Sequence, residues 1–373
     1  MTAEQAYKLL QNMIEIPSLS REETAVADFI QNYLENLGLE ISRVGNNLFS
    51  ICKDYSENKP TILLNSHIDT VKPSALWTKD PFKATEEDGK LYGLGANDAG
   101  ASVVSLIATF VNLTAKPQPY NLVLGISCQE EVSGKEGMEL LITKLPKIDF
   151  AIVGEPTQMQ LAVAERGLMV VDCKAKGKSG HAAREEGINA IYEALEDINW
   201  FKNYKFPKVS PILGPVKMTV SIIQAGTLHN VVPDSCTFTV DIRLNECYTH
   251  QEVFDTIQAN IKSEAKARSM RLKPSATDMN HPFVVGYLKT GGEVFGSSTL
   301  SDQALLSIPS VKIGPGDSAR SHTADEYIRL CEIEQAIETY TKLLDGLELV
   351  RSEELEVNVQ VRAELSLLRL CRA

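Results

Sequence analysis

The chain has 373 residues, of which 43% are hydrophobic and 23% are charged, and these are ordinary values for a globular protein. They exclude a collagen-like repeat, a disordered tail protein and a small disulfide scaffold, and the length favours two domains because one domain typically takes about 150 residues. Lys and Arg number 37 against 49 Asp and Glu, which gives a net charge of −12. Such an acidic protein is not expected to bind nucleic acid or an anionic membrane surface, since both require clustered positive charge.

The sequence predicts a cytoplasmic protein. Glu4, Lys8 and Glu15 interrupt the N-terminal segment, where a secretory signal would need an unbroken apolar stretch. Eighteen consecutive apolar residues occur nowhere, so no helix that spans a bilayer is predicted. The seven cysteines are scattered and form no C-x-x-C or C-x-x-H pair, which indicates reduced thiols rather than disulfides or a zinc ribbon.

The N-terminal part alternates helices with buried strands. The spacing of apolar residues predicts amphipathic helices over 3–15 and 22–37, and Gly38 follows the second as a stop signal. A third helix is predicted over 101–113. Short apolar runs, most of them rich in Val, Ile and Leu, predict strands at 48–52, 61–65, 121–127 and 150–153. Strands that alternate with helices indicate an α/β layer.

After Arg166 the pattern changes to that of half-buried antiparallel strands with polar residues on one face. Four strands and two helices are predicted in this part. The strands are expected at 168–175, 217–224, 236–243 and near Arg271, and the helices at 188–201 and 251–267. The order β-α-β-β-α-β is that of a split βαβ sandwich with one open face.

The α/β pattern returns from Thr290 onward. The elements predicted there are a helix at 299–306, a strand at 311–313 and a final helix at 333–344. A compact module is therefore inserted into a larger α/β domain, which is tolerated where the two ends of a module lie close together. We expect a discontinuous large domain at 1–166 plus 285–349, an inserted domain at 167–284, and a tail at 350–373 whose role is unknown.

Two candidate sites lie next to predicted elements, one after the strand at 61–65 and one before the helix at 101–113. His67 and Asp69 lie two residues apart in an extended segment and so point the same way, as in a metal-binding imidazole that a carboxylate orients. A lone His at a strand end, however, more often only caps the backbone. Asp98 precedes the helix, where it is either a ligand or an ordinary N-cap.

The glycines around Asp98 offer one other interpretation, a dinucleotide-binding loop. Gly93, Gly95 and Gly100 do not follow the G-x-G-x-x-G spacing, and Asp98 would repel a pyrophosphate at the helix N-terminus. A nucleotide-dependent dehydrogenase is therefore a minor alternative, which undetectable NAD binding would exclude.

Acidic and imidazole side chains follow three further strand ends. Glu130 and Glu131 follow the strand at 121–127, Glu155 follows the strand at 150–153, and His322 comes after a glycine-rich turn. Each could be a solvated loop residue on its own. Five such positions together predict a site for a pair of divalent metal ions. Imidazole and carboxylate ligands without a thiolate suit zinc, with cobalt or manganese as alternatives. The five ligands would be His67, Asp98, Glu131, Glu155 and His322.

These motifs resemble the acetylornithine deacetylase and succinyl-diaminopimelate desuccinylase family of co-catalytic zinc peptidases, with the acetylornithine deacetylase branch nearest. The resemblance follows residues 1–347 in order and rests on SHIDTVKP, WTKDPF, DGKLYGLGANDAG, CQEEVSGKEG, VGEPT, GKSGHAAR and GPGDSARSHTADEYI. It implies a zinc-peptidase-like catalytic domain, with helices on both faces of a mixed sheet. This domain would be interrupted by an inserted α+β lid and dimerisation domain.

The resemblance also implies how the metal ligands divide. His67 and Glu155 would hold one metal ion, and Glu131 and His322 would hold the other. Asp98 would bridge the two ions.

Further residues receive roles from the same resemblance. Asp69 would orient the first imidazole, and Glu130 would be the general base. His181, on the inserted domain, would reach the site of a neighbouring subunit and stabilise the oxyanion, which implies a homodimer. Asn230 and Arg243 resemble substrate-binding positions, although a surface ion pair is an equally good interpretation of Arg243.

The implied activity is hydrolysis of the amide bond of a small N-acyl amino acid. N-acetylornithine is the first choice, with N-acetylcitrulline or N-succinylornithine beside it, in arginine biosynthesis. The alternatives are a dipeptidase, aminopeptidase or carboxypeptidase, a succinyl-diaminopimelate desuccinylase, or an inactive metal-binding protein. Many family members continue Asp-Met-Lys-Gly from the bridging position, whereas this chain has Asp98-Ala99-Gly100-Ala101, which weakens any transfer of substrate specificity.

Overall fold

The computed structural model describes residues 1–184 and 186–349, so the tail predicted at 350–373 lies outside the described residues. The chain forms two compact units. The first comprises Met1–Ala162, Thr277–Val294 and the described residues from Leu306 onward, and the second comprises Val163–Ala276 and Phe295–Leu305. The sequence places the inserted domain at 167–284. None of the described helices is long and apolar enough to cross a membrane.

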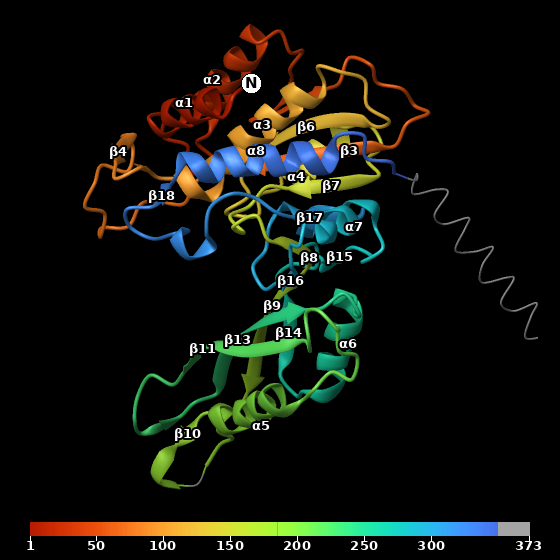
Figure 1. Ribbon diagram of the computed structural model, residues 1–373. Coiled ribbons are helices and arrows are strands. Elements are labelled where there is room, and N and C mark those ends of the chain that lie inside the picture. Colours follow the sequence, from red (N-terminus) through yellow and green to blue (C-terminus); the bar gives the residue numbers. More distant parts are fainter. Residues whose placement is uncertain (185, 350–373) are drawn as a thin grey trace, which may run out of the picture. The chain divides into compact units, whose positions relative to one another are not determined.

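A mixed sheet forms the centre of the first unit, with strands in the order β1-β2-β6-β3-β7-β17-β8 (Figure 1). Neighbours among β6, β3, β7 and β17 are parallel, whereas β1, β2 and β8 pair antiparallel with theirs. All residues of the four parallel strands are buried, as expected for strands covered on both faces. The strands are β1 Ser42–Val44, β2 Asn47–Ile51, β3 Thr61–His67, β6 Asn121–Ser127, β7 Phe150–Val153, β8 Leu161–Glu165 and β17 Ser310–Lys312.

Helices cover both faces of this sheet. Leu63 and Ser66 are three residues apart in β3 and so point to opposite faces. Gly154 lies between Ser66 and α3, whereas Gly125 lies between Leu63 and α4, which places these two helices on opposite faces. α1 and α8 pack against α3 (Figure 1). The helices of this unit are α1 Ala3–Ile14, α2 Thr24–Asn36, α3 Ala101–Leu113, α4 Met138–Leu141, α7 Pro282–Lys289 and α8 Leu330–Leu344.

A small sheet in the same unit joins two segments that are far apart in the sequence. Its order is β18-β5-β4, formed by Tyr327–Ile328, Lys90–Tyr92 and Thr85–Glu87. The pairing of Tyr92 with Tyr327 brings the loop after β5 next to the loop before β18. These two loops carry Asp98 and His322, so the small sheet helps to assemble the predicted metal site.

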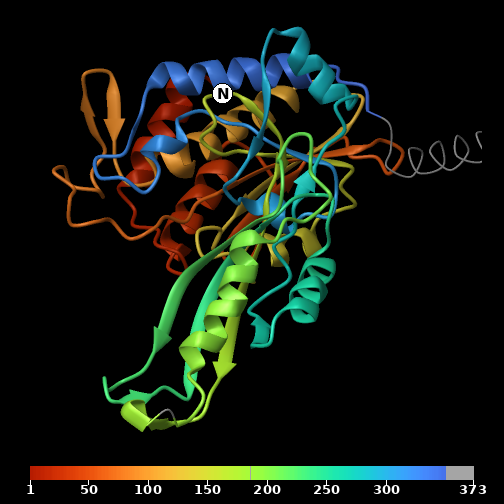
Figure 2. The ribbon, with the colours of Figure 1, turned by 90° about the horizontal axis from the view of Figure 1, so that it is seen from below.

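The second unit contains the predicted β-α-β-β-α-β module (Figure 2). Its antiparallel sheet has the order β11-β13-β9-β14, and buried residues of β9 alternate with more exposed ones. Side chains from α5 and α6, including Phe201 and Phe254, share one core with the buried face of the sheet. The elements are β9 Gly167–Lys176, α5 Ala190–Asn203, β11 Lys217–Ala225, β13 Ser235–Leu244, α6 His250–Asn260 and β14 Glu264–Ala267. Short strands complete it: β10 Gly180–His181, β12 Val231–Val232, and β15 Ser275–Ala276 and β16 Val294–Ser297, which pair with β8.

The predicted α/β fold with an inserted α+β module is confirmed, but two element predictions are wrong. The helix predicted at 251–267 ends at Asn260, and residues 264–267 form β14, the strand expected near Arg271. Charged and small residues alternate in this strand, and its pairing with β9 overrides the helical propensity of Glu, Ala and Lys.

The helix predicted at 299–306 is only a 3-10 turn over Asp302–Leu305. The Ser301 backbone N–H and hydroxyl both donate to the carboxylate of Glu165, at 3.0 and 2.7 Å. These hydrogen bonds attach the start of the segment to the end of β8.

Truncation of a buried strand residue tests the core of the first unit. Leu64, in β3, is 0% exposed, and we expect Leu64→Ala to lower the free energy of unfolding by about 2–5 kcal/mol through lost burial and a cavity. Guanidinium denaturation measures the change. Leu76→Ala is the control, because Leu76 is 78% exposed and its truncation should change stability by less than about 0.5 kcal/mol. Equal effects of the two substitutions would contradict the assigned core.

Candidate active site

The five predicted metal ligands come together at one edge of the central sheet. His67 ends β3, Glu131 follows β6, Glu155 follows β7, His322 lies in the loop after β17, and Asp98 lies between β5 and α3. The carboxyl ends of parallel strands meet at the same edge, which is where ligands bind in open α/β sheets. The topology therefore explains why residues spread over the whole first unit share one site.

Three carboxylates surround the imidazole of His67. Its Nε2 lies 3.4 Å from Asp98 Oδ1, 3.7 Å from Glu155 Oε1 and 3.9 Å from Glu130 Oε2. This Nε2 is buried and makes no hydrogen bond. A buried ring nitrogen without a partner is costly unless it binds something, so the surroundings of His67 fit a cation held between imidazole and carboxylates.

The second imidazole meets the other side of Asp98. His322 Nε2 lies 2.9 Å from Glu131 Oε2 and 3.7 Å from Asp98 Oδ2. The two oxygens of Asp98 thus face different imidazoles, as a ligand shared by two metal ions must. The peptide bond between Asp98 and Ala99 is cis.

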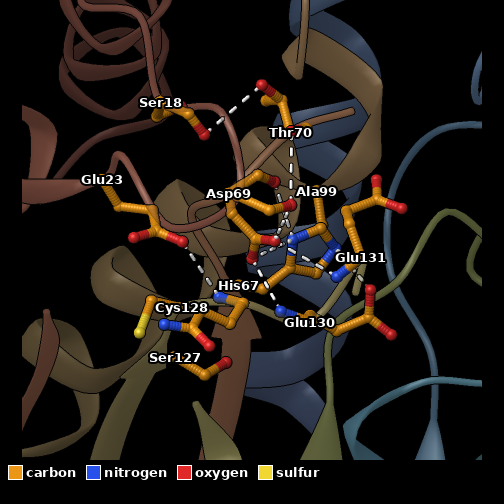
Figure 3. Close-up of polar contacts among 12 residues, drawn as sticks. Ser18, Glu23, His67, Asp69, Thr70, Ala99, Ser127, Cys128, Glu130 and Glu131 are labelled. Carbon is orange, nitrogen blue, oxygen red and sulfur yellow. Dashed lines mark hydrogen bonds and ion pairs between the residues drawn. The ribbon is translucent and has the colours of Figure 1, made fainter. Parts of the chain in front are cut away.

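The main chain of Asp69 orients His67 (Figure 3). Nδ1 of His67 lies 3.0 Å from the Asp69 backbone oxygen, whereas the nearest Asp69 carboxylate oxygen is 3.5 Å away. Donation from Nδ1 leaves Nε2 as the atom that faces the acids. The Asp69 carboxylate mainly accepts hydrogen bonds from the backbone N–H groups of Glu130 and Glu131, at 2.9 and 3.1 Å, and from the Ser20 hydroxyl, at 2.7 Å.

Crowded negative charge shifts the pKa of several groups toward protonation. Burial lowers the pKa of His67, but the neighbouring carboxylates of Asp69 and Asp98 outweigh burial and hold that pKa well above its ordinary value. Burial, reinforced by the charge of Asp98, raises the pKa of Glu155 well above its usual range. The hydrogen bond to Glu131 raises the pKa of His322 to about 9. All three shifts favour added positive charge, which a metal cation supplies as well as a proton does.

The donor set fits divalent metal ions. Two groups bring their ligand atoms within 4.8 Å of one another: His67 with Asp98 and Glu131, and His67 with Glu130 and Glu155. Imidazole and carboxylate donors without a thiolate suit zinc, cobalt or manganese. Glu130 therefore lies among the ligands, close enough to act beside them.

Sequence reasoning missed Glu326 and Asn97. Glu326 is 2% exposed, and its carboxylate accepts from the backbone N–H groups of Gly95, Asn97 and Asp98 at 3.2, 2.8 and 2.8 Å. Burial, with the charge of Asp98, raises the pKa of Glu326 to about 8. Asn97 in turn bonds the backbone of Asp317. These hydrogen bonds link the two loops that carry Asp98 and His322. In the sequence, only the position of Glu326, four residues after His322, could have indicated this link.

The remaining predicted residues lie in the second unit. His181 and Asn230 are neighbours, because β10 pairs with β12 and the Ala182 N–H donates to the Asn230 backbone oxygen at 3.1 Å. Arg243 forms a bidentate ion pair with Asp241, with N···O distances of 2.8 and 3.1 Å. The roles of these three residues in the reaction stay predictions.

The fold and the site define a metallohydrolase of the α/β type, and the comparison with known families agrees. Residues 63–346 match Peptidase family M20/M25/M40. This chain belongs to that family, whose co-catalytic dinuclear metal site corresponds to the cluster at the sheet edge. The matched segment begins in β3 and ends after α8, so it includes all five predicted ligands.

Named relatives share about a quarter of their residues with this chain. A succinyl-diaminopimelate desuccinylase from Wolbachia pipientis wMel is 28% identical over 279 residues, which cover 69% of this chain and 70% of that protein. An acetylornithine deacetylase from Proteus mirabilis is 26% identical over 371 residues, covering 91% of this chain and 96% of that protein.

Solved structures share the fold at lower identity. The aminopeptidase PepT from Bacillus cereus has a TM-score of 0.74 and 19% identity, covering 92% of this chain and 98% of that one. The Bacillus subtilis YXEP protein, described as a dinuclear metal-binding peptidase, has a TM-score of 0.69 and 17% identity, covering 92% and 97%.

Metal stoichiometry tests the predicted ligand set. We expect the chelator-treated protein to bind two equivalents of Zn²⁺ or Co²⁺ in a calorimetric titration, and His322→Ala to bind one tightly, because His67 and Glu155 keep their ligand atoms. His229→Ala is the control, since His229 is exposed and lies in the second unit. Two tight sites in His322→Ala would rule out the role of His322.

Proposed function

We propose that the protein hydrolyses the amide bond of a small N-acyl amino acid, and that N-acetylornithine deacylation in arginine biosynthesis is the activity. The observation that carries the proposal is Glu130, whose carboxylate lies 3.9 Å from His67 Nε2 within the ligand cluster. A carboxylate held beside the ligands is placed to move protons during hydrolysis. The acetylornithine deacetylase from Proteus mirabilis, alignable over almost its whole length, supports this substrate class.

The reaction requires activated water and a stabilised oxyanion. Bound metal ions, held by the five ligands, would polarise the acyl carbonyl as Lewis acids and lower the pKa of water. Glu130 takes the proton of the attacking water and delivers it to the leaving amine, which is general-base and then general-acid work. The backbone N–H groups of Glu130 and Glu131 donate to Asp69 and so hold the main chain that carries this carboxylate.

His181 is our candidate for the oxyanion donor. The Ala183 N–H lies 3.2 Å from His181 Nδ1, so Nδ1 accepts and the ring proton is expected on Nε2. A neutral imidazole that donates from Nε2 suits a developing oxyanion. Asn230 and Arg243 are proposed to contact the substrate, Arg243 through a guanidinium that Asp241 already orients.

Other substrates of the same chemistry are the runner-up. Similarity to the protein from Wolbachia pipientis named a desuccinylase makes succinyl-diaminopimelate one alternative substrate for this chain. The fold shared with the structure named an aminopeptidase makes short peptides another. A panel of N-acetylornithine, N-acetylcitrulline, N-succinylornithine, succinyl-diaminopimelate and dipeptides separates these possibilities. Turnover of dipeptides alone would overturn the deacylase proposal.

Replacement of Glu130 tests the mechanism. We expect Glu130→Gln to lower kcat by about 10²–10⁴-fold, because the amide cannot accept the proton of water. Metal content, measured by mass spectrometry, should stay at the wild-type value. Glu57→Gln, at an exposed position of the first unit, is the control and should keep kcat within about twofold. Full activity of Glu130→Gln with its metals bound would refute the proposed role.

We also propose that two copies associate through the second unit. β11 is an edge strand of its sheet, and among the described strands only β13 pairs with it. Ile222 and Ile223 of β11 are 49% and 52% exposed, and Tyr192 and Leu195 on the adjacent α5 are 66% and 50% exposed. An unpaired edge beside apolar side chains favours a symmetric pairing of two such edges.

Light scattering tests this association. The chain mass is 41.0 kDa, and we expect the wild type to have twice that mass in solution. Ile223→Asp should shift it toward the monomer, since a buried unpaired charge is costly at an interface. Leu76→Asp, at an exposed position of the first unit, is the control and should stay dimeric. A monomeric wild type would exclude the proposal.

A further inference from the structure

The segment that carries Glu130 and Glu131 is held through its backbone by three distant residues. Four consecutive N–H groups, from Cys128 to Glu131, each donate to a side-chain oxygen. The pairs are Cys128 to Asn47 Oδ1 at 3.0 Å, Gln129 to Glu23 Oε1 at 3.2 Å, Glu130 to Asp69 Oδ1 at 2.9 Å and Glu131 to Asp69 Oδ2 at 3.1 Å. Figure 3 shows Glu23 and Asp69 approaching this segment from two sides.

All three acceptor residues are completely buried. Glu23, Asn47 and Asp69 are each 0% exposed. Burial of a carboxylate is expensive unless hydrogen bonds satisfy it, and Glu23 also accepts from the Arg21 N–H at 2.6 Å and from Asn46 Nδ2 at 3.0 Å. The fold therefore places two buried acids beside an already acidic site, where Glu23 accepts one backbone N–H group of residues 128–131 and Asp69 accepts two.

The backbone of this segment needs such support. Gln129 has a φ of +56°, in the left-handed region that residues with a side chain seldom adopt. A conformation of this kind costs about 1–3 kcal/mol and persists where surrounding contacts determine it. The residue after Gln129 is Glu130, so a change at Gln129 would redirect the proposed general base.

We propose that Glu23 and Asn47 are positioning residues for the reaction. Together with Asp69 they fix the main chain of 128–131 and thereby aim the side chains of Glu130 and Glu131. Both residues precede residue 63, where the family match begins. The inference rests on the proposed function, in which Glu130 moves the proton. A misplacement of about 1 Å can cost about 10²-fold in rate, so the contribution is measurable.

Substitutions with a matched control separate positioning from stability. Glu23→Ala and Asn47→Ala should lower kcat by about 10- to 100-fold, with KM changed by less than about twofold. Glu23→Gln keeps an oxygen for the Gln129 N–H and should recover most of kcat. Asn121→Ala is the control, because Asn121 is also 0% exposed and accepts the Ser56 N–H at 2.9 Å, but lies at the opposite end of β6. We expect it to lower the melting temperature comparably while kcat stays within about twofold.

The absorption spectrum of the Co²⁺-loaded protein supplies a readout that does not depend on turnover. Since Glu131 is a predicted ligand, the visible bands should shift in Glu23→Ala and Asn47→Ala but not in Asn121→Ala. Equal losses of kcat in all three variants, with cobalt spectra like that of the wild type, would overturn the inference. If the wild type hydrolyses no N-acyl amino acid or peptide, the proposed function fails, and the cobalt spectra still decide the positioning role. Glu23→Gln serves where Glu23→Ala does not fold.

Discussion

Mutual repulsion of carboxylates is the constraint on which the first unit depends. Asp98, Glu130 and Glu155 all lie within 4 Å of one buried nitrogen of His67. Like charges at such distances in a poorly solvated space repel strongly, and only bound positive charge relieves the repulsion. Burial lowers the pKa of His67, but the same carboxylates outweigh burial and raise that pKa, whereas burial, reinforced by the charge of Asp98, raises the pKa of Glu155. The unit can hold this cluster because Glu130 and Glu155 follow two strands of the buried central sheet, β6 and β7, while Asp98 lies in the loop after β5 of the small sheet.

Backbone N–H groups provide the second means of control. Glu326 accepts three of them from the Gly95–Asp98 loop, and Asp69 accepts two from Glu130 and Glu131. Hydrogen bonds from N–H groups favour the ionised form of a carboxylate, although at Glu326 burial and the charge of Asp98 outweigh them and raise the pKa to about 8. Such acids can fix the loops of the site while the ligand acids remain available for metal. The site thus contains acids of two kinds, which differ in what they bind rather than in residue type.

The sequence predicted which side chains gather at the sheet edge better than it predicted the residues that hold their main chain. His67, Glu131 and Glu155 were predictable because apolar strands end just before them, and strand ends gather at one edge. Glu23 and Asn47 were not, because they act on the main chain of a segment about a hundred residues away, and no local pattern distinguishes them from solvated residues. β14 was mistaken for the end of a helix since tertiary pairing, not propensity, decides so short a segment.

The division into two units bears on specificity. Every proposed ligand and the proposed base lie in the first unit, whereas His181, Asn230 and Arg243 lie in the second. Residues that set the chemistry must keep their geometry within a fraction of an ångström, because metal binding and proton transfer both depend on it. Residues that contact the acyl group or the amino acid can change without disturbing that geometry. Relatives named deacetylase and desuccinylase are consistent with one kind of centre combined with different substrate contacts. The sequence Ala99-Gly100-Ala101, where many family members have Met-Lys-Gly, leaves the proposed ligand Asp98 in place, so a difference in substrate need not require a difference in metal chemistry.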